Sequence, residues 1–181
     1  MRTFVALELK DQALKSRIGE IQQELLATGA QLKPVEPQNL HITLKFIGET
    51  PESSVDGIIK ELDSVLVPPF SVHFRGLGVF PSSSRINVVW LGVKEGDNDL
   101  RALASKVNER LAKYGKPASF QAHLTIARVK GGRNLSALAS HVMEHGEEEG
   151  GPVDFGEFQL RKSVLTPEGP IYSDLKVFLL R

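Results

Sequence analysis

His41-Ile42-Thr43-Leu44 is repeated 82 positions later as His123-Leu124-Thr125-Ile126. Both copies read His-x-Thr followed by an aliphatic residue, and both lie in runs of residues that favour β-strand. The chain has five histidines and six threonines, so random placement would give only about 0.2 such pairs. The repeat in a matching context therefore predicts two related strands.

Residues i and i+2 of a strand point to the same face, so each copy places an imidazole beside a hydroxyl. If the two strands are neighbours, two imidazoles and two hydroxyls converge on one cleft. The alternation predicts that the intervening side chains enter a core: Leu40, Ile42, Leu44 and Phe46 in the first copy, and Leu124 and Ile126 in the second.

The rest of the chain alternates between strand-like and helix-like patterns. Asp11 is a suitable N-cap and Gly29 a suitable stop for the first helix, and Pro68-Pro69 ends the second, whose apolar face includes Leu66. The stretch Glu147-Glu148-Glu149-Gly150-Gly151 is typical of a solvated loop. Helices are expected near 11–28, 51–67, 100–111 and 135–143, and strands near 3–9, 41–48, 70–79, 86–93, 119–129, 153–165 and 171–180. This order favours an α+β fold with largely antiparallel sheets and helices on the outer faces.

Length and composition predict that residues 1–181 form one domain, or two small lobes that share a core. Lys and Arg together equal Asp and Glu at 22 each, so bulk charge favours neither nucleic acid nor membrane. The absence of cysteine excludes disulfides and thiolate chemistry. Neither a signal peptide nor a membrane-spanning run is evident, so we expect a cytoplasmic monomer that does not contact membranes.

Two histidines can divide proton transfer, one protonating a leaving oxygen while the other takes a proton from water. That division suits the opening of a phosphodiester, and Thr43 and Thr125 would reach its non-bridging oxygens. A single His-x-Thr is most often structural, and only the duplication favours a function. The rival functional interpretation is a metal site, which needs three or four ligands. His141 and His145 are four residues apart on an expected helix, but a solvated helix face is the simpler interpretation, so we expect no metal and no cofactor.

The chain resembles the two-histidine phosphoesterase superfamily, and within it the RNA 2′,3′-cyclic phosphodiesterases, also called 2′-5′ RNA ligases. The resemblance runs nearly end to end and rests on the duplicated motif, with individually weaker matches elsewhere. These are residues 2–7, 40–48, 78–81, 89–92, 120–128, 163–165 and 169–172. One position departs from the family pattern, which commonly has proline before the second histidine where this chain has Ala122.

The resemblance implies a bilobal fold in which two antiparallel sheets face each other across a cleft holding one motif each. The implied substrate is RNA, or a related nucleotide, ending in a 2′,3′-cyclic phosphate. Hydrolysis would give the 2′-phosphomonoester, with His41 as the acid and His123 as the base. Attack of a 5′-hydroxyl on the cyclic phosphate in place of water would form a 2′-5′ linkage without ATP. A non-catalytic module that binds RNA ends with the same cleft stays an alternative.

Four further residues are candidates for phosphate or RNA contacts. Strict alternation places Arg128 on the face of the strand opposite to that of His123. Arg128 therefore reaches the cleft only if the strand ends or bulges near Ala127. Phe80 and Tyr172 are candidates for stacking on a base, with core packing the alternative. Lys45 shares the parity of His41, so it is expected to line the cleft or to be solvated. Trp90 lies in an apolar run and is expected in the core.

Overall fold

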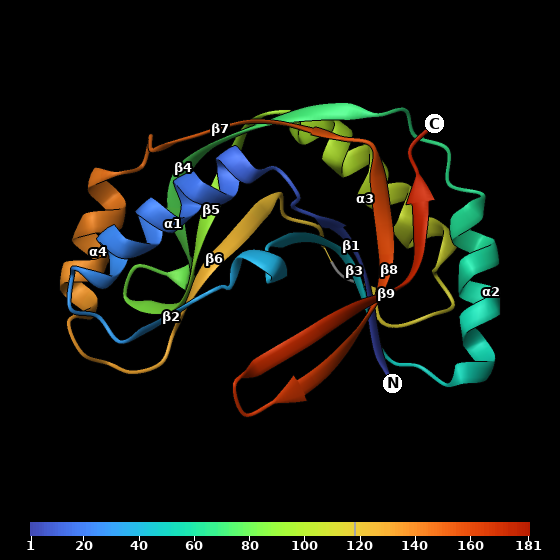
Figure 1. Cartoon of the computed structure of the whole chain (residues 1–181), viewed down its shortest axis with the longest axis horizontal. Helices are drawn as coiled ribbons and strands as arrows, with labels where there is room; N and C mark the ends of the chain where they lie inside the picture. Colours follow the sequence, from blue (N-terminus) through green and yellow to red (C-terminus); the bar gives the residue numbers. More distant parts are fainter. Residues whose placement is uncertain (118) are drawn as a thin grey trace.

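A computed structural model describes residues 1–117 and 119–181, and the predicted α+β fold with two antiparallel sheets is confirmed (Figure 1). Sheet A has the order β3-β1-β8-β9 and sheet B the order β2-β6-β5-β4-β7. Sheet A consists of β1 (Arg2–Glu8), β3 (His41–Glu49), β8 (Glu157–Thr166) and β9 (Gly169–Leu179). Sheet B consists of β2 (Leu32–Pro34), β4 (Phe70–Ser82), β5 (Arg85–Glu95), β6 (His123–Val129) and β7 (Glu149–Phe155).

The helices lie on the outer sides of the two sheets (Figure 1). Sheet B is covered by α1 (Gln12–Leu26) and α4 (Leu135–Glu144), and sheet A by α2 (Glu52–Asp63) and α3 (Asp97–Arg110). A short 3-10 turn, η1 (Pro37–Asn39), leads into β3. The predicted start of α1 is confirmed, because the Asp11 carboxylate accepts the Leu14 backbone N–H at 2.8 Å.

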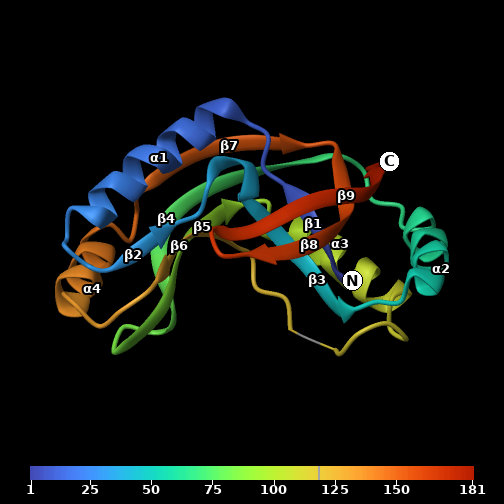
Figure 2. The ribbon, with the colours of Figure 1, turned by 60° about the horizontal axis from the view of Figure 1, so that its bottom comes forward.

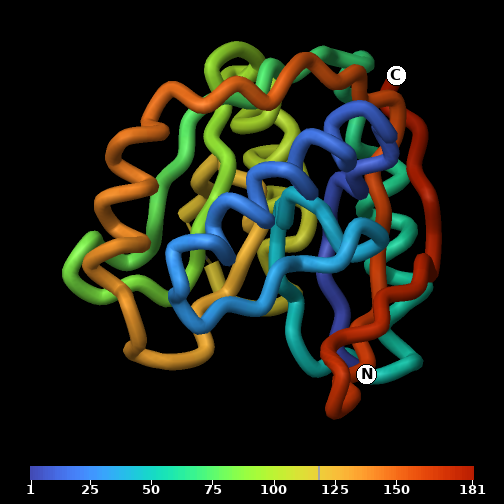
Figure 3. Tube along the Cα trace, turned by 60° about the vertical axis from the view of Figure 1, so that its left-hand side comes forward, coloured from blue at the N-terminus to red at the C-terminus, as the bar shows by residue number. Residues whose placement is uncertain are grey.

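The two sheets repeat one topology, with β3, β1, β8 and β9 corresponding in order to β6, β5, β4 and β7. The two halves of the chain are interlaced rather than separate. Helix α1 follows a strand of sheet A yet packs on sheet B, and α3 follows a strand of sheet B yet packs on sheet A (Figure 2). Figure 3 shows the first strand, in blue, beside β8 from near the other end of the chain, and the two strands pair antiparallel.

The side chains beneath the two histidine strands enter the core largely as predicted. Ile42, Leu44, Leu124 and Ile126 are 1%, 4%, 0% and 0% exposed. Phe46 is the exception, because it is 68% exposed and the prediction that it enters the core is wrong. Its position follows from a β-bulge described below.

Several predicted strand boundaries are wrong because pairing between strands decides where each strand begins and ends. Strands β4 and β5 extend their hairpin as far as Ser82 and Arg85, where residues 80–85 were expected to form the connection. Residues 149–151 belong to β7 rather than to a solvated loop, because they pair with β4. The single strand expected at 153–165 is two strands in different sheets, and Gly156 connects them.

The remaining differences are local. Strand β2 was not predicted, and β6 begins at His123 rather than near residue 119. Leu66 lies beyond the end of α2 and is 55% exposed, so it is not part of that helix's apolar face. Across residues 1–117 and 119–181, no helix is long and apolar enough to span a membrane.

Candidate functional site

A β-bulge follows each threonine of the repeat and sets the orientation of the residues beyond it. Strand β3 pairs Thr43 with Ala6 and Lys45 with Val5, so Leu44 is the extra residue. Strand β6 pairs Thr125 with Trp90 and then Ala127 with Val89, so Ile126 is the extra residue. Because a bulge shifts the alternation by one, the second residue after each extra residue returns to the face of its histidine. We call the face of each sheet that carries the histidine its inner face.

The bulge in β3 removes Lys45 from the inner face. Lys45 is 4% exposed, and its Nζ lies 3.5 Å from Asn108 Oδ1 and 3.4 Å from the Lys116 carbonyl oxygen. Burial lowers the pKa of Lys45. The expectation that Lys45 lines the cleft or is solvated is therefore wrong. Phe46 takes the inner position instead, with its ring centroid 6.0 Å from that of Phe4.

The bulge in β6 has the opposite consequence for Arg128. The sequence required a bulge near Ala127 to bring this guanidinium to the face of His123, and the register shift provides it. Arg128 is exposed there, and Phe46, the residue of β3 that matches it in the repeat, is exposed as well. The two bulges thus give sheet A an aromatic ring, Phe46, where sheet B has a guanidinium.

Both imidazoles are held by the same backbone contact. The Nδ1 of His41 lies 2.7 Å from the Asn39 carbonyl oxygen, and the Nδ1 of His123 lies 2.7 Å from the Gln121 carbonyl oxygen. Because a carbonyl only accepts, each Nδ1 carries the hydrogen, and each Nε2 of the neutral ring presents a lone pair. The Nε2 of His41 is 3.0 Å from the Thr43 hydroxyl oxygen, which then donates to it.

Aromatic rings frame both histidines in similar ways. The Tyr172 ring meets His41 edge-on at 5.2 Å and 88°, and the Phe80 ring meets His123 at 4.9 Å and 86°. A second ring supports each pair, Phe4 at 5.3 Å from His41 and Trp90 at 6.4 Å from His123. Tyr172 and Phe80, both predicted as candidates, therefore lie beside the histidines.

The two histidine strands, β3 and β6, contact each other although they belong to different sheets. Burial lowers the pKa of His41 to about 4, the bond to Asn39 opposes this, and the positive charges of Arg161, Arg128 and His123 lower it further. Burial also lowers the pKa of His123, opposed by the bond to Gln121. The charges of His123 and Arg128 act on His41, so these two groups lie in the electrostatic neighbourhood of His41.

Arg161 is a site residue that the sequence analysis missed. It is 4% exposed, its Nε donates to Asp174 Oδ1 at 2.9 Å, and its guanidinium lies 5.4 Å from the Tyr172 ring centroid. Its Nη2 is 3.9 Å from a Glu8 oxygen. Its Nη1 is buried and has no hydrogen-bond partner in the part of the chain that the structure describes. This unpartnered N–H donor near His41 can bind an anion such as a phosphate.

Trp90 was expected in the core, and this prediction is wrong. Its position opposite Thr125 in the β5–β6 pair puts its indole on the inner face, only partly buried. Gly78 on the adjacent strand makes room for it, since a Cβ there would lie 2.1 Å from the indole ring. The pairing of Gly78 with Trp90 across the hairpin is the sequence signal that could have placed the indole on the inner face.

Seven of the eight predicted site residues lie on the inner faces of the two sheets: His41, Thr43, Phe80, His123, Thr125, Arg128 and Tyr172. Two imidazoles, two hydroxyls and two guanidiniums can bind an anionic phosphate and move protons on either side of it. Among residues 1–117 and 119–181, the one group of three metal-ligand side chains lies elsewhere and includes neither His41 nor His123.

The duplicated motif and the fold agree with the comparisons to known proteins. The sequence profile of the LigT like Phosphoesterase family matches the chain twice, over residues 8–90 and 91–172, so each match contains one His-x-Thr. The chain is 42% identical over 180 residues to the RNA 2′,3′-cyclic phosphodiesterase of Archaeoglobus fulgidus, covering 98% of this chain and 99% of the relative. It is 40% identical over 162 residues to the enzyme of the same name from Aeropyrum pernix, covering 88% and 92%.

Solved structures agree with the fold. TT0787 of Thermus thermophilus superposes with a TM-score of 0.75 at 28% identity, covering 100% of this chain and 98% of the other. Apo LigT of E. coli gives a TM-score of 0.77 at 24% identity, covering 99% and 96%. The chain belongs to the LigT-like two-histidine phosphoesterase family, as its repeated motif predicted.

Proposed function

We propose that this protein is an RNA 2′,3′-cyclic phosphodiesterase, which hydrolyses the cyclic phosphate at an RNA end to a 2′-phosphomonoester. The name of the relatives at 36% to 42% identity supports the substrate class. The single observation that carries the chemistry is the matched anchoring of two imidazoles, each held through Nδ1 with Nε2 left for proton transfer. RNA ends, or nucleotides with the same cyclic phosphate, are the ligands that this site would bind.

The proposed reaction needs one proton donor and one proton acceptor. His123 Nε2 takes a proton from water as the water oxygen bonds to phosphorus. The bond between phosphorus and the 3′-oxygen breaks, and His41 Nε2–H protonates that oxygen. The 2′-oxygen keeps the phosphate, so atoms and charge balance without a metal or other cofactor.

The charge that develops on the phosphoryl oxygens requires donors that are already in place. Thr43 and Thr125 would supply hydroxyls, and Arg128 would supply a guanidinium from the β6 side. Arg161 would supply a second guanidinium from the β8 side to bind the phosphoryl oxygens, because its Nη1 is buried and has no partner among the described residues. Phe80, Tyr172, Trp90 and Phe46 provide faces on which a terminal base can stack.

The interlaced halves support one further proposal, that residues 1–181 act as a single bilobal domain. Each lobe supplies one His-x-Thr, and neither half contains both members of the acid–base pair. The same two imidazoles would let a 5′-hydroxyl attack the cyclic phosphate in place of water, with the 3′-oxygen leaving as before, and so form a 2′-5′ linkage. Water is abundant, so hydrolysis is the expected net reaction unless a second RNA end is bound in place.

The experiment is to incubate the purified protein, in excess EDTA, with an oligoribonucleotide ending in a 2′,3′-cyclic phosphate and to identify the product. A 2′-phosphate formed at an undiminished rate is the expected result. Loss of activity in EDTA that a divalent ion restores would contradict the metal-free mechanism. Tight binding of the oligonucleotide without turnover would favour the alternative, a non-catalytic RNA-end-binding module.

A further inference from the structure

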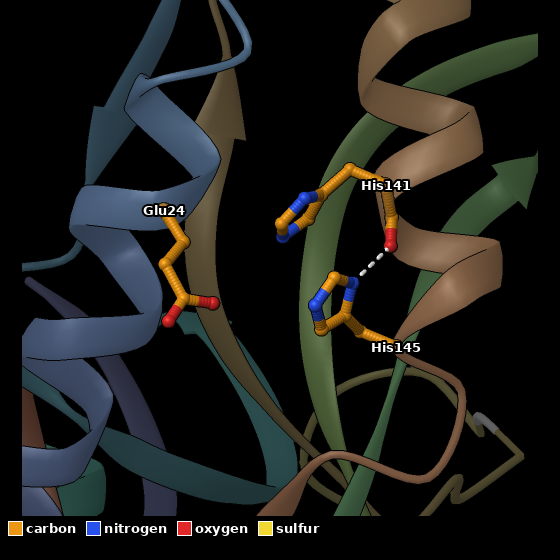
Figure 4. A group of neighbouring side chains, drawn as sticks. All are labelled: Glu24, His141 and His145. Carbon is orange, nitrogen blue, oxygen red and sulfur yellow. Dashed lines mark hydrogen bonds between the residues drawn. The ribbon is translucent and has the colours of Figure 1, made fainter.

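A second group of histidines lies away from the inner faces, between the outer helices α1 and α4. It consists of Glu24, His141 and His145, and one ligand atom from each lies within 4.8 Å of the others. Figure 4 shows the two imidazoles on α4 facing the Glu24 carboxylate on α1. The imidazole rings are stacked, with centroids 4.1 Å apart and an interplanar angle of 21°.

Each imidazole of this group has an Nε2 that can bind a metal. The Nε2 of His141 is buried and has no hydrogen-bond partner in the described part of the chain. The Nδ1 of His145 is 2.7 Å from the His141 carbonyl oxygen, so it carries the hydrogen and leaves Nε2 with a lone pair. A backbone carbonyl on the second nitrogen is the usual support for a metal-bound imidazole.

The positions of the three residues in their helices also favour a cation. Glu24 is in the last turn of α1, which carries no basic residue. His141 is in the last turn of α4, and His145 is its C-cap. Both helices therefore direct the negative ends of their dipoles at this group. A carboxylate in such a place is disfavoured unless a positive charge lies beside it.

We propose that Glu24, His141 and His145 form a binding site for one divalent ion of the Zn²⁺ type. Two imidazoles four residues apart on a helix and one carboxylate are a ligand set that zinc accepts, with water in the fourth position. Metal–ligand bonds of about 2.0–2.2 Å would draw the three atoms closer together, and the exposed Glu24 side chain can rotate to allow this.

The site would link α1 to α4 on the outer side of sheet B. These two helices come from different halves of the sequence match, 8–90 and 91–172, so a bound ion would cross-link them. His123 projects from the opposite face of sheet B, and His41 belongs to sheet A. The ion is therefore expected to stabilise the fold without taking part in the proposed hydrolysis, which does not depend on it.

The test is a Zn²⁺ titration of untagged, EDTA-treated protein by calorimetry, with thermal unfolding measured at each Zn²⁺ concentration. The wild type should bind one Zn²⁺ and show a raised Tm. His141→Gln and Glu24→Gln should each weaken binding at least about tenfold and abolish the rise in Tm. Glu24 is exposed, so its variant keeps the test valid even if His141→Gln folds poorly.

His73→Gln is the matched control, because His73 is a partly exposed histidine of sheet B that pairs with Glu149 outside the group. It should bind Zn²⁺ as the wild type does. Unchanged affinity in both His141→Gln and Glu24→Gln would overturn the proposal. Loss of binding in His123→Ala instead would place the ion at the inner faces and would also overturn it. Cyclic phosphate hydrolysis should be retained in His141→Gln.

Discussion

The surroundings of His41 and His123 are built on one plan and differ in charge and burial. Both rings are fixed through Nδ1 to the carbonyl two residues earlier, and both meet an aromatic edge at about 5 Å. His41, however, also contacts Thr43 and lies under the influence of Arg161, and burial lowers its pKa to about 4. His123 has the exposed Arg128 on its own strand face. Duplication supplied the geometry, and the flanking residues made the two sites unequal.

This inequality bears directly on the division of labour. With both pKa values lowered, the free protein holds two neutral imidazoles near pH 7, whereas the proposed reaction needs one protonated ring. A phosphate anion between the two rings would raise the pKa of both imidazoles, so that one of them binds a proton near pH 7. Substrate binding and protonation are therefore expected to be coupled.

The largest expected effect comes from removing either imidazole. His41→Ala and His123→Ala should each lower kcat about 10²–10⁴-fold, because each removes one proton transfer. If the two act as a unit, the double variant should be little slower than the slower single variant. Single-turnover rates on a cyclic phosphate oligonucleotide give the measurement, and a near-wild-type rate for either variant would end the acid–base interpretation.

The next effect tests the charge that distinguishes the His41 side. Arg161→Met should lower kcat/KM about 10²-fold. Arg161→Lys should lower it less, because lysine keeps the positive charge but lacks the paired N–H donors of the guanidinium. Removing this charge should also raise the pKa of His41, which Arg161 helps to lower. The pH profile therefore distinguishes this role from a structural one.

Arg101→Met is the control for Arg161→Met. Arg101 is an exposed arginine of α3 whose Nε is 2.7 Å from Asp97 Oδ2. Its replacement should leave kcat/KM and the pH profile unchanged. Equal losses in both variants would mean that Arg161 has no special place in the site.

A smaller effect is expected from the two hydroxyls. Thr43→Val and Thr125→Val should lower the rate about 10–100-fold, the cost of one hydrogen bond to a charged group and less than the histidine variants. Thr43→Val should cost more than Thr125→Val, because the Thr43 hydroxyl also contacts His41 Nε2 at 3.0 Å. Equal losses would show that this contact has no influence on the reaction. Steady-state kinetics of the two purified variants make the comparison.

The mildest test is the pH dependence of the wild type. The productive free enzyme carries one proton on the pair, and both pKa values lie below the ordinary imidazole value of about 6.5. A plot of kcat/KM against pH should therefore be bell-shaped and should already be falling as the pH rises above about 6.5. Both limbs of the plot of kcat against pH should lie at higher pH than those of kcat/KM, because the bound anion favours the imidazolium. A flat profile from pH 5 to 8 would contradict this account.

The sequence predicted the parts of this site that depend on local order. The i, i+2 alternation placed His41 beside Thr43 and His123 beside Thr125, and it placed the apolar residues between them in the core. The N-cap at Asp11 and the four helices also followed from local patterns. In these places each residue's neighbours along the chain decide its environment.

The sequence failed where strand pairing decides the outcome. One extra residue after Thr43 buries Lys45 and exposes Phe46, and nothing in the strand itself marks that bulge. Trp90 reaches the inner face because Gly78 lies on the partner strand, and Arg161 becomes a site residue because β8 pairs with β1. Such contacts join residues far apart in the chain, so alternation alone does not reveal them.

The most direct test of the acid–base pair uses a cyclic substrate whose 3′-oxygen is replaced by sulfur. A thiolate leaves with little protonation, so this substrate bypasses the acid and still needs the base. The 3′-thio substrate should restore most of the rate to His41→Ala and none to His123→Ala. Restoration of His123→Ala instead would contradict the assignment of roles, and restoration of neither would contradict the pair itself.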